Sequence, residues 1–297
     1  MMNVDVIVVG AGPAGLTAAI YCARAGKSTL VLEKEFIGGK ITTTPVVKNI
    51  PGFSEISGLD FATKLYEQAI ECGATFAVGE NVVQINSRED GFIELKTDFD
   101  DTYECKACIL ATGTTNRKLG FDREDEFIGN GISFCTTCDG PFYKDKNVIV
   151  VGGGNSAVTE AIELATIASK VTLVQNMSTL TAEAALLDEL SKYNNVETKT
   201  SVNITGYNIV NDELRGLTTE DGIIDADGVF LAIGLVPCNS NFINVVALDK
   251  QGFIDTSKAK NVFSCGDCKG DTFKQVAVAC GSGATAAIST IRYLNQN

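Results

Sequence analysis

The sequence predicts an α/β protein made of two Rossmann-like, three-layer (ββα/βαβ) nucleotide-binding domains, the second inserted into the first. Two glycine-rich turns, Gly10-Ala-Gly-Pro-Ala-Gly15 and Gly152-Gly-Gly-Asn-Ser-Ala157, each stand between a strand-like and a helix-like segment. Two apolar stretches that end in small residues, 109–113 and 229–234, resemble crossings between domains. We therefore expect a discontinuous first domain, 1–115 and 240–297, and an inserted domain, 116–239.

The first glycine turn has the full βαβ context. A strand is expected from Val4 to Val9, a helix from Gly15 to Ala25 and a second strand from Ser28 to Leu32. Glu33 follows, 23 residues past Gly10, where a carboxylate would accept hydrogen bonds from a ribose. The glycines allow a pyrophosphate to approach the helix N-terminus, so this unit is predicted to bind a dinucleotide.

The second turn repeats the architecture without the acidic end. Strands are expected over 147–151 and 170–174, with a helix over 155–168. The position 23 residues past Gly152 is Gln175, and the stretch from there to Thr181 contains neither a carboxylate nor an arginine. The turn is interpreted as a structural relic, with residual nucleotide binding, including a second flavin nucleotide, as the open alternative.

The C-terminal part returns to the first domain. Cys265-Gly266-Asp267 follows an apolar strand, and a helix rich in alanine and other small residues is expected from Gln275 to Tyr293. Small residues let a helix N-terminus lie close to a ligand.

Composition narrows the chemistry. The 297 residues carry a formal charge of −13, which speaks against nucleic acid or an anionic membrane as a main partner. No histidine is present, so mechanisms that need an imidazole are excluded. No apolar run is long enough for a membrane span and no signal peptide is recognisable, so a soluble, cytoplasmic protein is expected.

The pentad Cys135-Thr-Thr-Cys138-Asp139 carries the redox prediction. Two thiols with two residues between them can close a small ring, and such pairs hold one thiol at a lowered pKa. Asp139, next to the second sulfur, is a carboxylate placed where a departing or attacking thiolate would need a proton. A catalytic, reversible disulfide is therefore expected.

The other cysteines are interpreted as packing residues. Cys105 and Cys108 mimic half of a four-cysteine metal site, but Cys108 enters an apolar strand, so no metal is expected. Cys265 and Cys268 overlap the Gly-Asp turn and are read as thiols beside a cofactor. Cys22 and Cys280 are read as core residues.

Together these motifs resemble the low-molecular-weight thioredoxin reductase family over essentially the whole chain. The resemblance implies FAD as cofactor, with Cys138 against the flavin, Cys135 attacking the thioredoxin disulfide and Asp139 as acid. It places the pyrophosphate and adenosine ribose on the first glycine turn and Glu33, the ribityl chain at Asp267, and the isoalloxazine ring near residues 274–276. The implied cofactor-binding residues are Gly10, Gly12, Pro13, Ala14, Gly15, Glu33, Lys34, Gly39, Lys40, Asn49, Ala111, Thr112, Gly113, Gly266, Asp267, Lys274, Gln275 and Val276.

The chain departs from the family in the residues that would bind the electron donor. NADPH-dependent members carry a His-Arg-Arg-x-x-x-Arg run after the second fingerprint, but this chain reads Gln175-Asn-Met-Ser-Thr-Leu-Thr181. The chain is most similar in this respect to the ferredoxin-dependent flavin thioredoxin reductases, so ferredoxin is expected as donor. Family resemblance further implies a homodimer.

Ferredoxins are usually acidic, which makes a −13 protein an awkward partner. The segment from Arg24 to Lys48 has five basic and two acidic residues, a local excess of 5 − 2 = +3 that could steer the encounter or be merely solvated surface. Other readings stay open: an NAD(P)H-dependent thioredoxin reductase with an atypical site, a two-flavin disulfide oxidoreductase, a dithiol oxidase, or a non-catalytic redox module.

Overall fold

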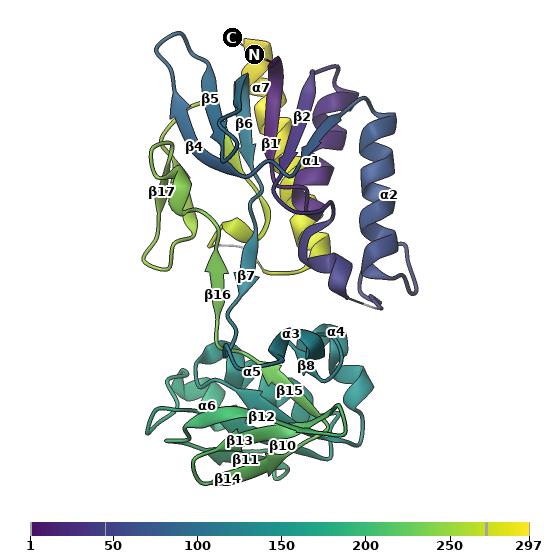
Figure 1. Cartoon of the computed structure of the whole chain (residues 1–297), viewed down its shortest axis with the longest axis vertical. Helices are drawn as coiled ribbons and strands as arrows, with labels where there is room; N and C mark the ends of the chain where they lie inside the picture. The colour runs from purple at the N-terminus through teal and green to yellow at the C-terminus, as the bar shows by residue number, and fades with distance from the viewer. Residues whose placement is uncertain (1, 45, 271–272, 297) are drawn as a thin grey trace. The chain divides into compact units, whose positions relative to one another are not determined.

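The computed structural model describes residues 2–44, 46–270 and 273–296, and the chain divides into two compact units (Figure 1). Unit 1 comprises Met1–Thr115 and Val236–Asn297, and unit 2 comprises Asn116–Leu235. The chain passes between them in two short strands that pair with each other, β7 (Thr114–Asn116) and β16 (Leu235–Pro237). Because β16 carries the return crossing, that crossing lies at Val236, earlier than the boundary expected at residue 240.

Unit 1 is built on a sheet of order β3-β2-β1-β6-β5-β4, with β19 also paired to β6. The strands β1, β2, β3, β6 and β19 run parallel, whereas β4, β5 and β6 are antiparallel. Their bounds are β1 (Met2–Val9), β2 (Thr29–Glu33), β3 (Thr75–Val78), β4 (Val82–Ser87), β5 (Ile93–Thr97), β6 (Thr102–Leu110) and β19 (Val262–Ser264).

The register of this sheet assembles the predicted site. Val9 pairs with Leu32 and Leu110, and Leu110 pairs with Ser264. The carboxyl ends of four parallel strands therefore meet at one edge, where ligands bind in open α/β sheets. Glu33 lies at that edge, as the last residue of β2. The first glycine turn, Thr112-Gly113 and Gly266-Asp267 follow it.

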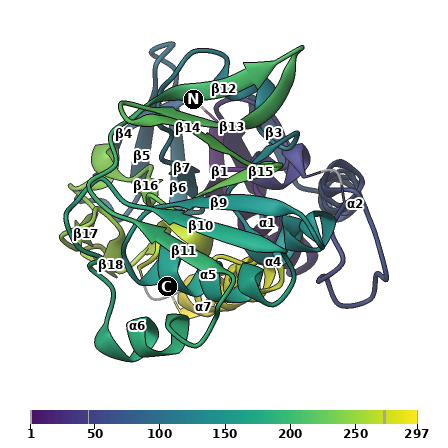
Figure 2. The ribbon, with the colours of Figure 1, turned by 90° about the horizontal axis from the view of Figure 1, so that it is seen from below.

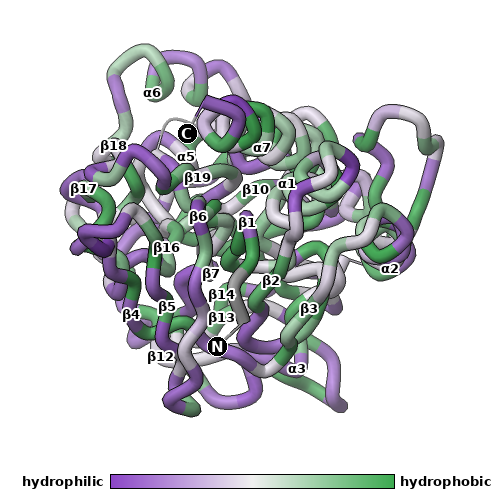
Figure 3. Tube along the Cα trace, turned by 90° about the horizontal axis from the view of Figure 1, so that it is seen from above, coloured by the Kyte–Doolittle hydropathy of each residue, from purple (hydrophilic) through white to green (hydrophobic). Residues whose placement is uncertain are grey.

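Helices cover one face of the sheet: α1 (Pro13–Arg24), α2 (Gly58–Glu71) and α7 (Val276–Gln296). Small residues let α1 and α7 approach closely, since a Cβ on Gly283 would lie 2.2 Å from the Ala14 carbonyl oxygen. The other face packs against η3 (Ser240–Phe242), β17 (Val246–Leu248) and β18 (Ile254–Ser257). Figure 3 shows hydrophobic residues gathered along β1 and α7.

Unit 2 has a parallel sheet of order β11-β10-β9-β15-β8, with helices on one face and an antiparallel sheet on the other (Figure 2). The parallel strands are β8 (Ile132–Ser133), β9 (Asn147–Val151), β10 (Lys170–Val174), β11 (Val196–Lys199) and β15 (Gly228–Leu231). The helices α5 (Asn155–Ala165) and α6 (Ala184–Leu190) pack on it, and the second sheet comprises β12 (Ile204–Val210), β13 (Glu213–Thr219) and β14 (Gly222–Asp225).

The shorter helical segments are η1 (Gly39–Thr43) and η4 (Gly266–Cys268) in unit 1, and α3 (Glu124–Phe127), α4 (Thr136–Asp139) and η2 (Gly140–Tyr143) in unit 2. The predicted α/β class with two Rossmann-like domains is confirmed. The helix expected over 155–168 ends at Ala165, because the chain turns there to lead Lys170 into β10. Within the described part of the chain, no helix is both long and apolar enough to cross a membrane.

Candidate functional site

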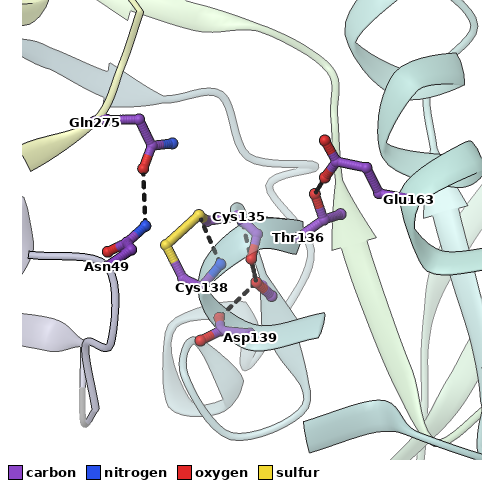
Figure 4. The surroundings of a disulfide bond; sticks show 8 residues. Asn49, Cys135, Thr136, Cys138, Asp139, Glu163 and Gln275 are labelled. Carbon is purple, nitrogen blue, oxygen red and sulfur yellow. Dashed lines mark hydrogen bonds between the residues drawn. A yellow bond between two sulfur atoms is a disulfide. The ribbon is translucent and has the colours of Figure 1, made fainter. Parts of the chain in front are cut away.

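Cys135 and Cys138 form a disulfide on the short helix α4, with their Cα atoms 5.3 Å apart (Figure 4). Cys135 stands at the helix N-cap, where its Sγ accepts a hydrogen bond from the Cys138 N–H at 3.2 Å. Both cysteines are partly exposed. The pair is therefore in its oxidised, disulfide form, and a reaction partner can reach it.

Asp139 lies on the same turn and is held by Ser133. The Ser133 hydroxyl donates to Asp139 Oδ2 at 2.6 Å and accepts the Cys135 N–H at 3.1 Å. Burial raises the pKa of the Asp139 carboxyl, and the hydrogen bond from Ser133 opposes part of that rise. A carboxyl that keeps its proton to higher pH suits the role of an acid beside a disulfide.

The helix α5 supplies two further carboxylates to this region. Thr136 lies between the two cysteines in sequence, and its side chain is buried. Its hydroxyl donates to Glu163 Oε2 at 2.5 Å (Figure 4). Glu160, one turn earlier, is largely buried, and burial together with the charge of Glu163 raises its pKa to about 7. Its Oε2 has no hydrogen-bond partner among the described residues.

The three glycines of the first fingerprint have three different surroundings. A Cβ on Gly10 would lie 2.4 Å from the Ala111 carbonyl oxygen, and one on Gly15 would lie 1.9 Å from the Gly10 carbonyl oxygen. These two glycines are required for packing. A Cβ on Gly12 would meet nothing nearer than the Gly38 carbonyl oxygen at 4.0 Å, so the space at the start of α1 is open.

That opening is bordered by residues suited to an adenosine diphosphate group. Gly39 faces Gly12, since a Cβ on Gly39 would lie 3.4 Å from the Gly12 Cα. Pro13 and Ala14 begin α1, whose first backbone N–H groups favour an anion. Glu33 is buried and accepts the Ala11 N–H at 2.7 Å and the Glu35 N–H at 3.0 Å. Each of its oxygens keeps a further lone pair for a ribose hydroxyl.

Lys40 joins two of the predicted cofactor-binding segments. Its Nζ donates to the Thr114 hydroxyl at 2.7 Å and forms an ion pair with Asp267 Oδ2 at 3.2 Å. Lys274 bonds the backbone of the same turn, donating to the Asp267 carbonyl at 3.1 Å and the Lys269 carbonyl at 2.5 Å. The Gly266-Asp267 turn is thus fixed from two sides.

The remaining predicted residues are distributed around unit 1. Asn49 donates to Gln275 Oε1 at 3.1 Å, which ties the 49–52 loop to the segment before Val276, where α7 begins. Ala111, Thr112 and Gly113 follow β6 into the crossing. Lys34 forms an exposed ion pair with Glu35 at 3.0 Å, and that pairing raises its pKa.

In the second glycine turn, the chain packs closely against Gly153 but leaves the N-cap Gly154 open. Gln175 is buried against Gly153, so that a Cβ on Gly153 would lie 2.1 Å from Gln175 Nε2. Thr181 bonds the same glycine, since its N–H donates to the Gly153 carbonyl at 2.7 Å. At the start of α5, Asn155 and Glu183 exchange two hydrogen bonds. The segment 175–183 therefore folds back over the turn.

The other paired cysteine spacings are buried thiols. Cys105, Cys108, Cys265 and Cys268 are all 0% exposed, and burial raises the pKa of each thiol. Cys22 is equally buried and Cys280 is half-buried, as a packing interpretation requires.

Sequence reasoning missed three residues that support the site. Ser133 joins Asp139 to Cys135. Asn239, which is 0% exposed, accepts from the Thr112 hydroxyl at 2.8 Å and donates to the Cys268 carbonyl at 3.0 Å. Ser282 accepts the Gly266 N–H at 3.1 Å. Small polar residues in a pattern of buried strands and helices give no signal of their partners, which are distant in sequence.

The open glycine turn with its buried carboxylate, and a second Rossmann-like unit that carries a two-cysteine disulfide, define a flavin-linked disulfide oxidoreductase. The chain belongs to the pyridine nucleotide-disulphide oxidoreductase family, whose model matches residues 4–283, and within it to the thioredoxin reductase homologues. FAD is the cofactor of this class, and the room at Gly12 and the lone pairs of Glu33 fit it.

The relatives cover nearly the whole chain. It is 37% identical to a thioredoxin reductase of Listeria monocytogenes, over 98% of this chain and 94% of the relative. It is 39% identical to a 34.2 kDa protein in the rubredoxin operon of Clostridium pasteurianum, over 98% of this chain and 97% of the relative. The structure of a thioredoxin reductase from Streptococcus pyogenes superposes with a TM-score of 0.91 at 30% identity, with 99% of each chain covered.

Proposed function

We propose that this protein is a FAD-dependent reductase of thioredoxin that receives electrons from reduced ferredoxin rather than from NADPH. The observation that carries the choice of donor is the lack of any arginine from Gln175 to Thr181, the segment that packs against the second glycine turn. Thioredoxin as the acceptor is supported by the relatives that bear the name thioredoxin reductase and by the partly exposed disulfide.

The proposed route of electrons runs through unit 1 to the disulfide of unit 2. When bound, FAD accepts electrons singly and passes them on as a pair, which is what a one-electron donor requires. Cys138 is the proposed flavin-side sulfur and Cys135 the sulfur that attacks thioredoxin. In the transfer, the Cys135 thiolate forms a bond to one sulfur of the target disulfide, whose other sulfur leaves as a thiolate. The Cys138 thiolate then reforms the enzyme disulfide and releases the second target sulfur.

Three features oppose a pyridine nucleotide in unit 2. Gln175 places an uncharged amide where Glu33 of the first unit offers a carboxylate to a ribose. No arginine stands between Gln175 and Thr181 to bind a 2′-phosphate. From Arg117 to Asn239 the chain has 9 basic and 18 acidic residues, so this segment carries 9 − 18 = −9 and repels a multiply anionic dinucleotide.

Ferredoxin is a sufficient reductant. Low-potential ferredoxins reach about −400 mV, whereas the thioredoxin couple lies near about −270 mV. Since about 30 mV corresponds to about 1.4 kcal/mol for a two-electron couple, the transfer is downhill by roughly 6 kcal/mol.

The basic segment from Arg24 to Lys48 is less positive than its residue count indicates. Lys40 pairs with Asp267 and Lys48 with Glu55, both at 3.2 Å and both with acidic residues outside the segment. Ion pairing within the chain leaves less charge to attract an acidic partner. Electrostatic steering by this segment is therefore expected to be weak. Because both partners are acidic, added salt should screen their repulsion and raise the rate of reduction by ferredoxin.

The donor is tested by anaerobic stopped-flow mixing of the FAD-loaded protein with reduced ferredoxin, NADPH or NADH, while the visible flavin absorbance is recorded. We expect bleaching with ferredoxin alone, and onward reduction of thioredoxin when it is added. Rapid bleaching by micromolar NADPH would overturn the proposed donor and leave the thioredoxin step standing. Photochemically reduced protein serves as the control that the flavin itself is competent.

The two sulfurs are tested separately. Cys135→Ser should abolish thioredoxin turnover but leave Cys138 able to perturb the flavin spectrum, whereas Cys138→Ser should prevent electrons from leaving the flavin. Cys72→Ser, at a free and partly exposed cysteine, is the matched control and should retain full activity. Intact turnover in Cys138→Ser would show that the two roles are assigned wrongly.

We further propose that the chain works as a homodimer in the cytoplasm. The family resemblance supports the dimer, and the eight free cysteines suit a reducing compartment. Light scattering behind size-exclusion chromatography should give about twice the chain mass of 31.4 kDa. A mass equal to one chain at micromolar concentration would refute the dimer.

A further inference from the structure

Ser133 is the last residue of β8 and lies two positions before the first cysteine. It is only 4% exposed, so its hydroxyl group needs partners within the protein. Those partners are Asp139 Oδ2 at 2.6 Å and the Cys135 N–H at 3.1 Å. One side chain therefore contacts both ends of the disulfide turn.

The direction of the two bonds is determined by chemistry. The Cys135 N–H can only donate, so the Ser133 oxygen accepts it. The single hydroxyl hydrogen is then available for Asp139 or for the Cys135 carbonyl, and the distances of 2.6 and 3.4 Å favour Asp139. A hydroxyl that donates to a carboxylate makes a short, charge-assisted bond, which is stronger than a bond between neutral groups.

We propose that Ser133 is a positioning residue, which holds the Asp139 carboxyl on the disulfide turn and couples it to the backbone of Cys135. The proposal rests on the proposed role of Asp139 as the acid of the disulfide exchange. The strand β8 is itself fixed by parallel pairing with β15, where Ser133 opposes Phe230, a residue of the buried core. The carboxyl is thereby anchored to the central sheet of unit 2.

Other titratable groups surround α4. Tyr143, on the neighbouring η2, has a pKa raised by burial and by the charges of Asp139 and Asp227. Glu160 and Glu163 lie on α5, and Glu163 holds Thr136 on the turn itself. Burial raises the pKa of Asp139 and so disfavours its charged form. Ser133 acts in the opposite direction, because its donated hydrogen bond stabilises the carboxylate.

The consequence concerns the proton of the exchange. As the Cys135–target bond forms and the target disulfide breaks, the departing thiolate takes the proton from Asp139. Ser133 then stabilises the carboxylate left behind, and the acid regains its proton from solvent when the enzyme is next reduced. Without the hydroxyl, Asp139 should keep its proton to higher pH and should adopt more than one orientation.

The test compares Ser133→Ala, Ser133→Thr and Thr136→Val. Thr136→Val is the matched control, because it also removes a buried hydroxyl from the same turn, but one bonded to Glu163 instead of Asp139. Each FAD-loaded variant is reduced with dithionite and mixed with excess thioredoxin disulfide, and the single-turnover rate is measured across pH. In the plot of this rate against pH, the limb that Asp139→Asn removes is the one that depends on the Asp139 carboxyl.

We expect Ser133→Ala to move that limb to higher pH by about one to two units, as loss of a hydrogen bond to a charged group implies. Ser133→Thr should restore the original limb, and Thr136→Val should leave it in place. If Ser133→Ala folds poorly, Ser133→Gly should show the same displacement. An unmoved limb in both hydroxyl-free variants would overturn the proposal. Chemical reduction bypasses the natural donor, so failure of the ferredoxin assignment would not affect this result.

Discussion

The side chain of Gln175 occupies the space in front of Gly153: a Cβ at that glycine would lie 2.1 Å from Gln175 Nε2 and 2.5 Å from Gln175 Cδ. The residue of the first fingerprint that matches Gly153 is Ala11, whose N–H donates to Glu33 Oε2 at 2.7 Å. The two units thus share the same strand–turn–helix design, and the N-cap glycines Gly12 and Gly154 are both open, with no atom nearer than 3.8 Å to an added Cβ. The units differ in the side chain that packs against the second residue of the turn, which is the carboxylate of Glu33 in unit 1 and the uncharged amide of Gln175 in unit 2.

The contact between Gln175 and Gly153 predicts how substitutions at these two positions change the stability of the protein. Gly153→Ala should lower the free energy of unfolding by about 1–3 kcal/mol, because the new methyl group forces Gln175 out of its buried position. In a Gln175→Ala background the same change should cost less than about 1 kcal/mol, since the clash is gone. Urea unfolding of the four proteins measures the coupling.

Gly154→Ala is the control for this cycle. A Cβ there would have its nearest contact with the Thr181 hydroxyl oxygen at 3.8 Å, an ordinary van der Waals distance. Its effect should therefore be small in either background. An equal cost of Gly153→Ala with and without Gln175 would show that the covering contact is absent in solution.

The sequence was sufficient to predict the elements that carry the fingerprints. Strands over 147–151 and 170–174 lie where the alternation of glycine turns and apolar runs placed them, because local hydrophobic pattern and turn chemistry agree there. The sequence also showed that no arginine follows Gln175 in this segment. It did not predict the contact of Gln175 with Gly153, because a glutamine has no characteristic partner and its position depends on the loop that follows.

The polar contacts that support the site could not be predicted from the sequence either. Asn239 bonds Thr112 and the Cys268 carbonyl, which lie 127 and 29 residues away in sequence. Such bonds arise only when the sheet brings strand ends together. The glycines and cysteines could be assigned roles from spacing alone, whereas Ser133 and Asn239 required the fold.

The open space at Gly12 predicts a separation between folding and cofactor binding. Gly12→Ala should change the stability of the apoprotein by less than about 1 kcal/mol, as expected for glycine to alanine at an N-cap. It should nevertheless weaken FAD binding more than about tenfold, because the methyl group fills the room that the pyrophosphate needs. Titration of apoprotein with FAD, followed by flavin fluorescence, measures the affinity.

Gly15→Ala provides the contrast, since its Cβ would lie 1.9 Å from the Gly10 carbonyl oxygen. This variant should unfold at a lower urea concentration even without FAD. If Gly12→Ala binds FAD normally, the pyrophosphate does not pass over this glycine and the cofactor assignment of the turn is wrong.

Glu160 predicts a pH dependence of stability. Burial and the charge of Glu163 raise its pKa to about 7 in the folded protein, above the ordinary value of 4.5. The folded state therefore binds more protons than the unfolded state between those values, so this residue makes stability fall as pH rises from about 4.5 to about 7. Glu160→Gln should remove this cost and raise the free energy of unfolding at pH 8 by about 1–3 kcal/mol, with little change at pH 4.5.

Thermal unfolding of the wild type and Glu160→Gln at pH values from 4.5 to 8 measures the difference. Glu189→Gln is the matched control, because it removes one charge from an exposed carboxylate paired with Lys192. Such exposed pairs contribute at most about 1 kcal/mol, so its effect should be small and nearly independent of pH. A gain in Glu160→Gln that is the same at both ends of the range would show that Glu160 is charged, and tolerated, throughout.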